Sequence, residues 1–163
     1  SIKIKNKILN LDVIHPRPEL NEKERKEFFR RVIKKIKKPY ILSGDFNSLS
    51  PLDHYNLEKL KKGYKTFMGE KGEWKAEDIY KAKAIEVIIK KGLVDSHLFS
   101  NQNENYTVPT NWRNKNKDSA VRIDYLFCSE DIKIIEAGII KNNLTENASD
   151  HYPIFAKIKI EDN

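Results

Sequence analysis

The chain has 163 residues, enough for one domain with its own core over residues 1–163 and too few for two comfortable ones. Lysine and arginine number 31 against 24 acidic residues, and the net charge of +7 favours polyanionic partners such as nucleic acid, although a Lys/Asn/Ile-rich composition alone produces the same charge. Cys128 is the single cysteine, which excludes an intrachain disulfide and a cysteine metal cluster, and no apolar run predicts a membrane span or a signal peptide, so we expect a cytoplasmic protein.

Two strands are predicted first, because apolar residues alternate over residues 2–4 and 8–14. The second predicted strand runs directly into Pro16 and Pro18, which cannot take part in a central hydrogen-bond ladder. We therefore expect His15 to lie at the C-terminal end of this strand.

A helix is predicted next. Asn21 and Glu24 match a capping box, an apolar stripe runs from Phe28 to Ile36, and Pro39 ends the helix. The basic residues of the segment fall on the opposite helix face.

A short buried strand at 40–42 leads into the sequence Ser-Gly-Asp-Phe-Asn at 43–47. Asp45 and Asn47 are two residues apart, so on an extended backbone both side chains point to one side. A carboxylate beside a carboxamide suits water activation with a neutral donor to a phosphoryl oxygen, or coordination of a hard cation. The alternative interpretation is an Asx-rich turn between a strand and a helix.

Two further helices are predicted in the middle of the chain. Ser50 and Pro51 have the residue types of an N-cap and a first helical position, and this helix is expected to finish near Gly63. The other is expected over residues 77–91, with Gly92 as the residue that follows its C-terminus.

Residues 100–120 are polar and irregular, which predicts a long loop. Trp112 and Arg113, with Lys115 and Lys117, are candidates for binding a phosphate backbone. The alternative is that the aromatic residues of the loop only anchor it to the core.

Strands at 121–129, 132–141 and 153–161 complete the pattern, so helices and strands alternate at first and strands dominate the end. This order predicts an α/β fold with mixed sheets flanked by helices. Within it, Asp124 lies between apolar residues of a predicted buried strand, and Asp150 and His151 precede another.

Burying a carboxylate is costly unless it is paired. We therefore expect Asp124 to pair with His151, orienting the imidazole and favouring its charged form. The alternative is that Asp124 is a surface residue of an edge strand and that Asp150 and His151 form a turn.

Taken together, His15, the Gly-Asp-Phe-Asn motif at 44–47, Arg-Ile-Asp-Tyr at 122–125 and Ser-Asp-His-Tyr-Pro-Ile at 149–154 resemble the endonuclease/exonuclease/phosphatase (DNase I-like) superfamily. The resemblance covers essentially the whole chain, with the motifs in the family order. It implies a layered α/β sandwich and a phosphoester hydrolase that depends on Mg²⁺ or Mn²⁺.

The resemblance also implies roles for individual residues. Asp45 would position or deprotonate the attacking water, and Asn47 would hold a phosphate oxygen. His151, paired with Asp124, would stabilise the charge that develops on the phosphoryl group, and His15 would be a further phosphate contact.

Metal ligation is the point at which the chain departs from the family. Asp45, Asn47 and Asp150 are implied to lie at the metal, whereas the family's principal ligand is a glutamate in an N-terminal half, and nothing before His15 matches it. We therefore expect the chain to be the C-terminal portion of such a domain, with an exposed sheet face that needs a partner.

The substrate stays open between a small phosphoester and nucleic acid, because fold and chemistry do not fix it. Two alternatives to a general phosphoester hydrolase are therefore kept. One is a DNA or RNA endonuclease or exonuclease, and the other is a non-catalytic half-domain that acts as a binding module.

Overall fold

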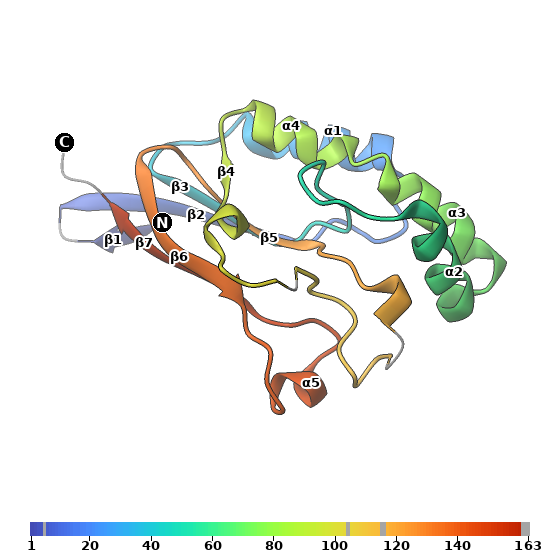
Figure 1. Ribbon diagram of the computed structural model, residues 1–163. Helices are drawn as coiled ribbons and strands as arrows, with labels where there is room; N and C mark the ends of the chain where they lie inside the picture. Colours follow the sequence, from blue (N-terminus) through green and yellow to red (C-terminus); the bar gives the residue numbers. More distant parts are fainter. Residues whose placement is uncertain (5, 104, 115–116, 161–163) are drawn as a thin grey trace.

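The computed structural model describes residues 1–4, 6–103, 105–114 and 117–160, which form three layers (Figure 1). Helices α1 and α4 cover one face of a central sheet, and a smaller sheet lies on the other face. The strands are β1 (Ile2–Ile4), β2 (Lys7–Ile14), β3 (Tyr40–Asp45), β4 (Val94–Asp95), β5 (Asp124–Cys128), β6 (Ile132–Ile139) and β7 (Ile154–Ile160). The α-helices are α1 (Glu22–Ile33), α2 (Leu57–Met68), α3 (Glu70–Tyr80), α4 (Lys83–Lys90) and α5 (Thr145–Ala148).

The central sheet has the order β1-β2-β3-β5-β4 within the described residues, and β6 pairs with β7 in the second sheet. Strands β2 and β3 are parallel, whereas β5 runs antiparallel to β3. As a result, the C-terminal ends of β2 and β3 and the N-terminal end of β5 meet at one edge. That edge carries the polar residues that the sequence places at strand ends.

The main core lies between the central sheet and helices α1 and α4. Phe29 of α1, Ile85 of α4 and the strand residues Leu42 and Phe127 are all fully buried there. Helix α1 begins with the predicted capping box, since the Asn21 side chain accepts a hydrogen bond from the Glu24 backbone and the Glu24 side chain accepts one from Asn21. The predicted α/β class with mixed sheets is therefore confirmed.

The opposite face of the central sheet is only partly covered. Leu9 of β2 and Ile41 of β3 are buried against β6 and β7. Leu11 and Val13, further along the same face of β2, remain 38% and 73% exposed. An exposed apolar sheet face is present, as expected from the sequence.

The prediction of a helix that starts at Ser50 and Pro51 is wrong at both ends. The Ser50 hydroxyl accepts a hydrogen bond from the Leu52 backbone in a turn, and α2 starts six residues later than Pro51, capped by Asn56. Tertiary contacts override the local signal, because Asp53 pairs with the buried Arg122 and so holds this segment out of a helix. The predicted end near Gly63 is also wrong, since α2 continues to Met68.

The helix predicted over residues 77–91 is two helices, α3 and α4. The break falls at Ala82, which has a left-handed backbone (φ 51°) and lies in the core. At the start of α4, the Ala84 backbone N–H donates to the buried Glu22 carboxylate at 2.7 Å. This contact satisfies an otherwise unpaired helix N-terminus and stabilises the break. Gly92 follows α4 with a positive φ, as predicted.

The three C-terminal strands are confirmed with shorter bounds than predicted, and residue 161 of the last one lies outside the described residues. Strand β3 is longer than predicted and extends through Asp45, so it carries the first half of the Gly-Asp-Phe-Asn motif. No helix in the described ranges combines the length and apolar character needed to cross a membrane.

Candidate active site

The site begins where β2 and β3 come closest. Gly44 is the parallel partner of Ile14 and has a φ of 135°. A Cβ atom at this position would lie 2.0 Å from the Ile14 carbonyl oxygen, far inside the van der Waals contact distance. Only glycine fits, and its absence of a side chain lets β3 deliver the next residue, Asp45, to the sheet edge.

Asp45 and Asn47 are organised by one another. The Asn47 backbone N–H donates to Asp45 Oδ1 at 2.8 Å, and the Asn47 side-chain amide donates to Asp45 Oδ2 at 3.2 Å and to the Pro16 carbonyl at 3.1 Å. Asn47 has a φ of 48°, a left-handed conformation that asparagine tolerates. The motif is therefore an Asx turn in local structure, and the same turn fixes the direction of the Asp45 carboxylate.

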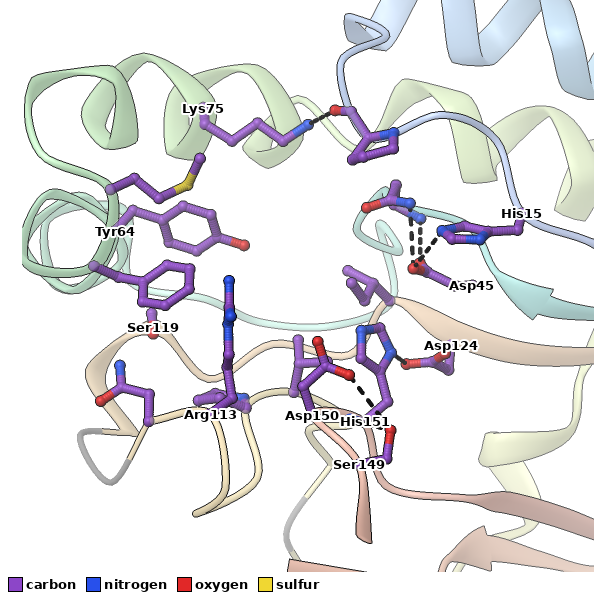
Figure 2. A pocket seen from close by; sticks show the side chains of 18 residues that line it. His15, Asp45, Tyr64, Lys75, Arg113, Ser119, Asp124, Ser149, Asp150 and His151 are labelled. Atoms are coloured by element: carbon purple, nitrogen blue, oxygen red, sulfur yellow. Dashed lines mark hydrogen bonds and ion pairs between the residues drawn. The ribbon is translucent and has the colours of Figure 1, made fainter. Parts of the chain in front are cut away.

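The predicted contact between Asp124 and His151 is present. His151 Nδ1 lies 2.9 Å from Asp124 Oδ2, and both side chains are partly buried. Burial acts to lower the pKa of His151, but the hydrogen bond to Asp124 and the charges of Asp124, Asp45 and Asp150 outweigh it and raise the pKa. The pairing leaves Nε2 on the side of the cavity shown in Figure 2.

Asp45 faces this pair directly, because it is the cross-strand partner of Asp124. Burial raises the pKa of Asp45 and the charge of Asp124 raises it further, while the Asn47 backbone, His151 and His15 act in the other direction. A carboxyl group with an elevated pKa at a strand end is the arrangement expected of a proton acceptor.

His15 and Asp150 complete the predicted set. His15 follows β2 directly, and its Nε2 lies 3.3 Å from Asp45 Oδ2, with two thirds of the side chain exposed. Asp150 lines the same cavity and points into it beside His151 (Figure 2). The structure therefore brings all six residues predicted from the motifs to one place.

These residues form one end of a cavity of about 650 Å³. The other end is formed by residues that the sequence did not indicate, from α2, α3 and the loop at 105–114: Tyr64, Phe67, Met68, Lys75, Val108, Pro109 and Asn114. Tyr64 to Met68 were missed because the predicted helix stopped at Gly63. The available signal was the presence of Phe67 and Met68 at exposed positions of an otherwise basic helix.

Of the two predicted substrate-binding residues, Arg113 lines the cavity and Trp112 does not. Trp112 is 61% exposed, and its backbone N–H donates to the Glu146 carbonyl. Lys115, named with them, lies outside the described residues.

Arg122 of the Arg-Ile-Asp-Tyr motif has a positional role. Its buried guanidinium donates to Asp53 at 2.9 Å and to Asp95 at 3.0 Å, and it lies over the Tyr125 ring at 4.4 Å. These bonds connect the segment before α2, β4 and the start of β5. They hold the backbone on which Asp124 is placed.

A hard cation fits this site in part. Burial and then the charge of Asp124 raise the pKa of Asp45, and a cation nearby would favour its ionised form. The part of the chain that the structure describes contains no group of three or more His, Cys, Asp or Glu side chains placed to hold a metal ion. The donor types are therefore appropriate for Mg²⁺, and the acidic ligand set is smaller than such a site normally uses.

Comparisons with known proteins identify the fold. No protein-family model matches the chain, and no curated protein matches it. Among solved structures, a conserved protein of unknown function from Enterococcus faecalis superposes with a TM-score of 0.59 at 15% identity, over 93% of this chain and 50% of that one. An endonuclease/exonuclease/phosphatase from Bacteroides vulgatus gives 0.59 at 18% identity, over 86% and 45%.

The 3′ phosphatase NExo from Neisseria, in a structure with a product DNA hairpin, gives a TM-score of 0.54 at 18% identity, over 85% of this chain and 51% of that one. The fold is therefore that of the endonuclease/exonuclease/phosphatase proteins, as the motifs predicted. The chain spans about half the length of these structures, which agrees with a resemblance to one portion of the family domain.

Proposed function

We propose that the protein hydrolyses phosphoester bonds with the help of a divalent cation, Mg²⁺ or Mn²⁺. The observation that carries the proposal is the convergence of Asp45, the Asp124–His151 pair and His15 at one end of a large cavity. The pKa values of Asp45 and His151 are both raised, and shifted pKa values of polar groups in a cavity are the usual mark of a reactive site.

In this proposal Asp45 accepts a proton from, or orients, the attacking water, because its raised pKa makes it a better acceptor than an ordinary aspartate. The contact with Asp124 raises the pKa of His151 and so favours its charged form, which donates from Nε2 to an oxygen of the phosphoryl group. His15 reaches the same phosphoryl group from the end of β2.

Asp45, Asn47 and Asp150 would hold the cation. When bound, a hard divalent ion supplies positive charge that polarises the phosphoryl oxygens. The contribution of the chain is to aim these oxygen donors into the cavity, and the short bond between Asn47 and Asp45 sets their spacing.

The test is a phosphatase assay on a panel of phosphoesters with Mg²⁺, Mn²⁺ or EDTA. EDTA is expected to abolish turnover, and His151→Ala is expected to lower kcat by roughly 10²–10⁴-fold, the usual contribution of a positioned acid or base. His54→Ala is the matched control, because His54 is exposed and does not line this cavity. Equal, measurable activity of His151→Ala and the unsubstituted protein would refute the role of His151, and no turnover by either would favour the binding-module alternative.

Nucleic acid is the second candidate substrate, for two reasons. The net charge is +7, and one of the structures with this fold is a 3′ phosphatase with bound DNA. A nuclease of this kind is expected to lose affinity for DNA steeply as salt rises, with a linear dependence of log K on log salt. Affinity that is flat with salt would exclude a backbone-binding mode.

A further inference from the structure

The cavity has charges of opposite sign at its two ends. Three aspartates, Asp45, Asp124 and Asp150, lie at the end that holds the histidines. Lys75 and Arg113 lie at the end formed by α2 and α3 (Figure 2). The proposed reaction uses only the acidic end, which leaves the basic end without a role.

The Arg113 side chain has a restricted orientation and is available to bind a ligand. Its guanidinium lies over the Phe67 ring, 5.1 Å from the ring centre, which restricts its orientation. Within the described residues no carboxylate pairs with it, and it points into the cavity (Figure 2). A guanidinium in this state has its planar array of donors available for a phosphate, the group it binds best.

Tyr64 adds a second donor. Its hydroxyl points into the same part of the cavity and makes no hydrogen bond within the part of the chain that the structure describes (Figure 2). The helix that carries it is fixed in place at Gly63 and Gly72. A Cβ at Gly63 would lie 2.5 Å from the Asp118 backbone, and one at Gly72 would lie 2.1 Å from the Tyr64 carbonyl oxygen. Close backbone packing at these two glycines therefore restricts the position of α2 and of the Tyr64 hydroxyl that it carries.

Lys75 is the third donor. Its Nζ donates to the Pro18 carbonyl at 2.6 Å and leaves further donor capacity toward the cavity. Burial, reinforced by the charge of Arg25, lowers the pKa of Lys75 to about 8, although Asp78, Glu22 and Glu19 act to raise it. An anion bound in the cavity would remove this penalty, because it would stabilise the charged ammonium.

We propose that Tyr64, Lys75 and Arg113 form a second oxyanion subsite, so that the substrate is a phosphoester whose other part carries a second phosphate group. The inference rests on the proposed function for the first phosphate. Two kinds of substrate could supply this second phosphate: a small bisphosphate, or a nucleic-acid strand through its neighbouring phosphate.

The experiment measures binding by calorimetry in a His151→Ala background, so that turnover does not interfere. Two matched pairs of probes are used: fructose monophosphate against fructose bisphosphate, and thymidine monophosphate against the phosphorylated thymidine dinucleotide. Charge-assisted hydrogen bonds to the second phosphate are expected to tighten binding roughly ten- to hundredfold in one pair. A gain in the first pair identifies a small bisphosphate, and a gain confined to the second identifies the strand.

The gain is expected to disappear in Arg113→Gln and to shrink in Tyr64→Phe and Lys75→Met. Matched controls remove the same groups from exposed positions on α1 and α3 that do not line the cavity: Arg31→Gln, Tyr80→Phe and Lys71→Met. All three are expected to keep the full gain. Arg113 is exposed, so its substitution does not threaten folding.

Equal affinity within both pairs would overturn the subsite, even if the protein hydrolyses phosphoesters. A gain that survives Arg113→Gln, Tyr64→Phe and Lys75→Met would overturn it as well. Conversely, a gain that depends on Arg113 in a protein without hydrolytic activity would support the subsite and refute the proposed function.

Discussion

Asp45 and Asp124 face each other as paired residues of the antiparallel strands β3 and β5. Two carboxylates on directly opposed positions repel each other, and the sheet tolerates them because His15 and His151 contact one each. The site is therefore two histidine–aspartate contacts placed side by side at one sheet edge.

Replacing Asp124 with Asn is expected to lower the pKa of His151. The substitution removes the charge that raises it and replaces the carboxylate acceptor with a weaker, neutral amide oxygen, whereas burial, which acts to lower the pKa, remains. An NMR titration of the His151 ring protons measures the shift. Asp150→Asn is the control and is expected to have a smaller effect, since Asp150 acts only through its charge. An unchanged titration in Asp124→Asn would refute the pairing.

The same pair predicts a pH dependence of stability. Because the folded pKa of His151 is raised, the pair stabilises the fold fully below the unfolded value of about 6.5, and this contribution is lost as pH rises through the folded pKa. Urea unfolding from pH 5 to 9 would show a decline across that window, and the decline should be smaller in Asp124→Asn. Parallel curves for the two proteins would contradict the prediction.

The Asp45→Asn substitution is expected to raise the stability of the fold and to abolish the proposed activity. Burial and the charge of Asp124 raise the pKa of Asp45, so the ionised carboxylate is a cost to the fold at neutral pH. Removing it should stabilise the protein by roughly 0.5–2 kcal/mol while abolishing the proposed hydrolysis. Thermal melts at pH 7.5 and initial rates test the two halves. A lower Tm would show that the hydrogen bonds of the carboxylate outweigh its charge.

Gly44→Ala is expected to destabilise the protein strongly. The new Cβ would meet the Ile14 carbonyl oxygen at 2.0 Å at a φ of 135°, so the contact between β2 and β3 has to open. The cost should exceed about 3 kcal/mol, the upper range of ordinary overpacking. Gly92→Ala is the control, since its φ is also positive but no atom lies within 4 Å, and it should cost about 1–2 kcal/mol. Similar unfolding free energies for the two variants would refute the close-packing argument.

The uncovered face of β2 predicts self-association. Val13 is 73% exposed and Leu11 38% exposed on the sheet face that β6 and β7 leave open. Replacing both with Lys should reduce association at high concentration with little loss of unfolding free energy. Sedimentation velocity measures the first effect and urea unfolding the second. Identical sedimentation before and after substitution would show that this face does not drive contacts.

The end of β2 was predictable because a short, local signal, Pro16, decides it. The end of β3 was not, since the strand runs through Gly44 to Asp45, beyond its predicted bound at residue 42. The convergence of His15, Asp45, Asp124 and His151 follows once the strands are placed. The pairing of Asp124 with His151 followed from the cost of a buried, unpaired carboxylate.

The α2–α3 side of the cavity could not be predicted in this way. Ser50 and Pro51 carry a genuine helix-start signal, but the buried Arg122 takes Asp53 as its partner and prevents that helix. The break at Ala82 depends on the contact between Ala84 and Glu22, which are 62 residues apart in the chain. Long-range polar contacts of this kind leave no mark in local periodicity.

The candidate site draws its side chains from residue 15 to residue 151, each from the end of a different strand or the loop before one. No contiguous stretch of the chain contains the site, so it exists only while the strands stay paired, including β2 and β3 at their close contact at Gly44. Because Asp124 starts β5 of the central sheet and His151 precedes β7 of the second sheet, loss of their contact during heating would report separation of the two sheets.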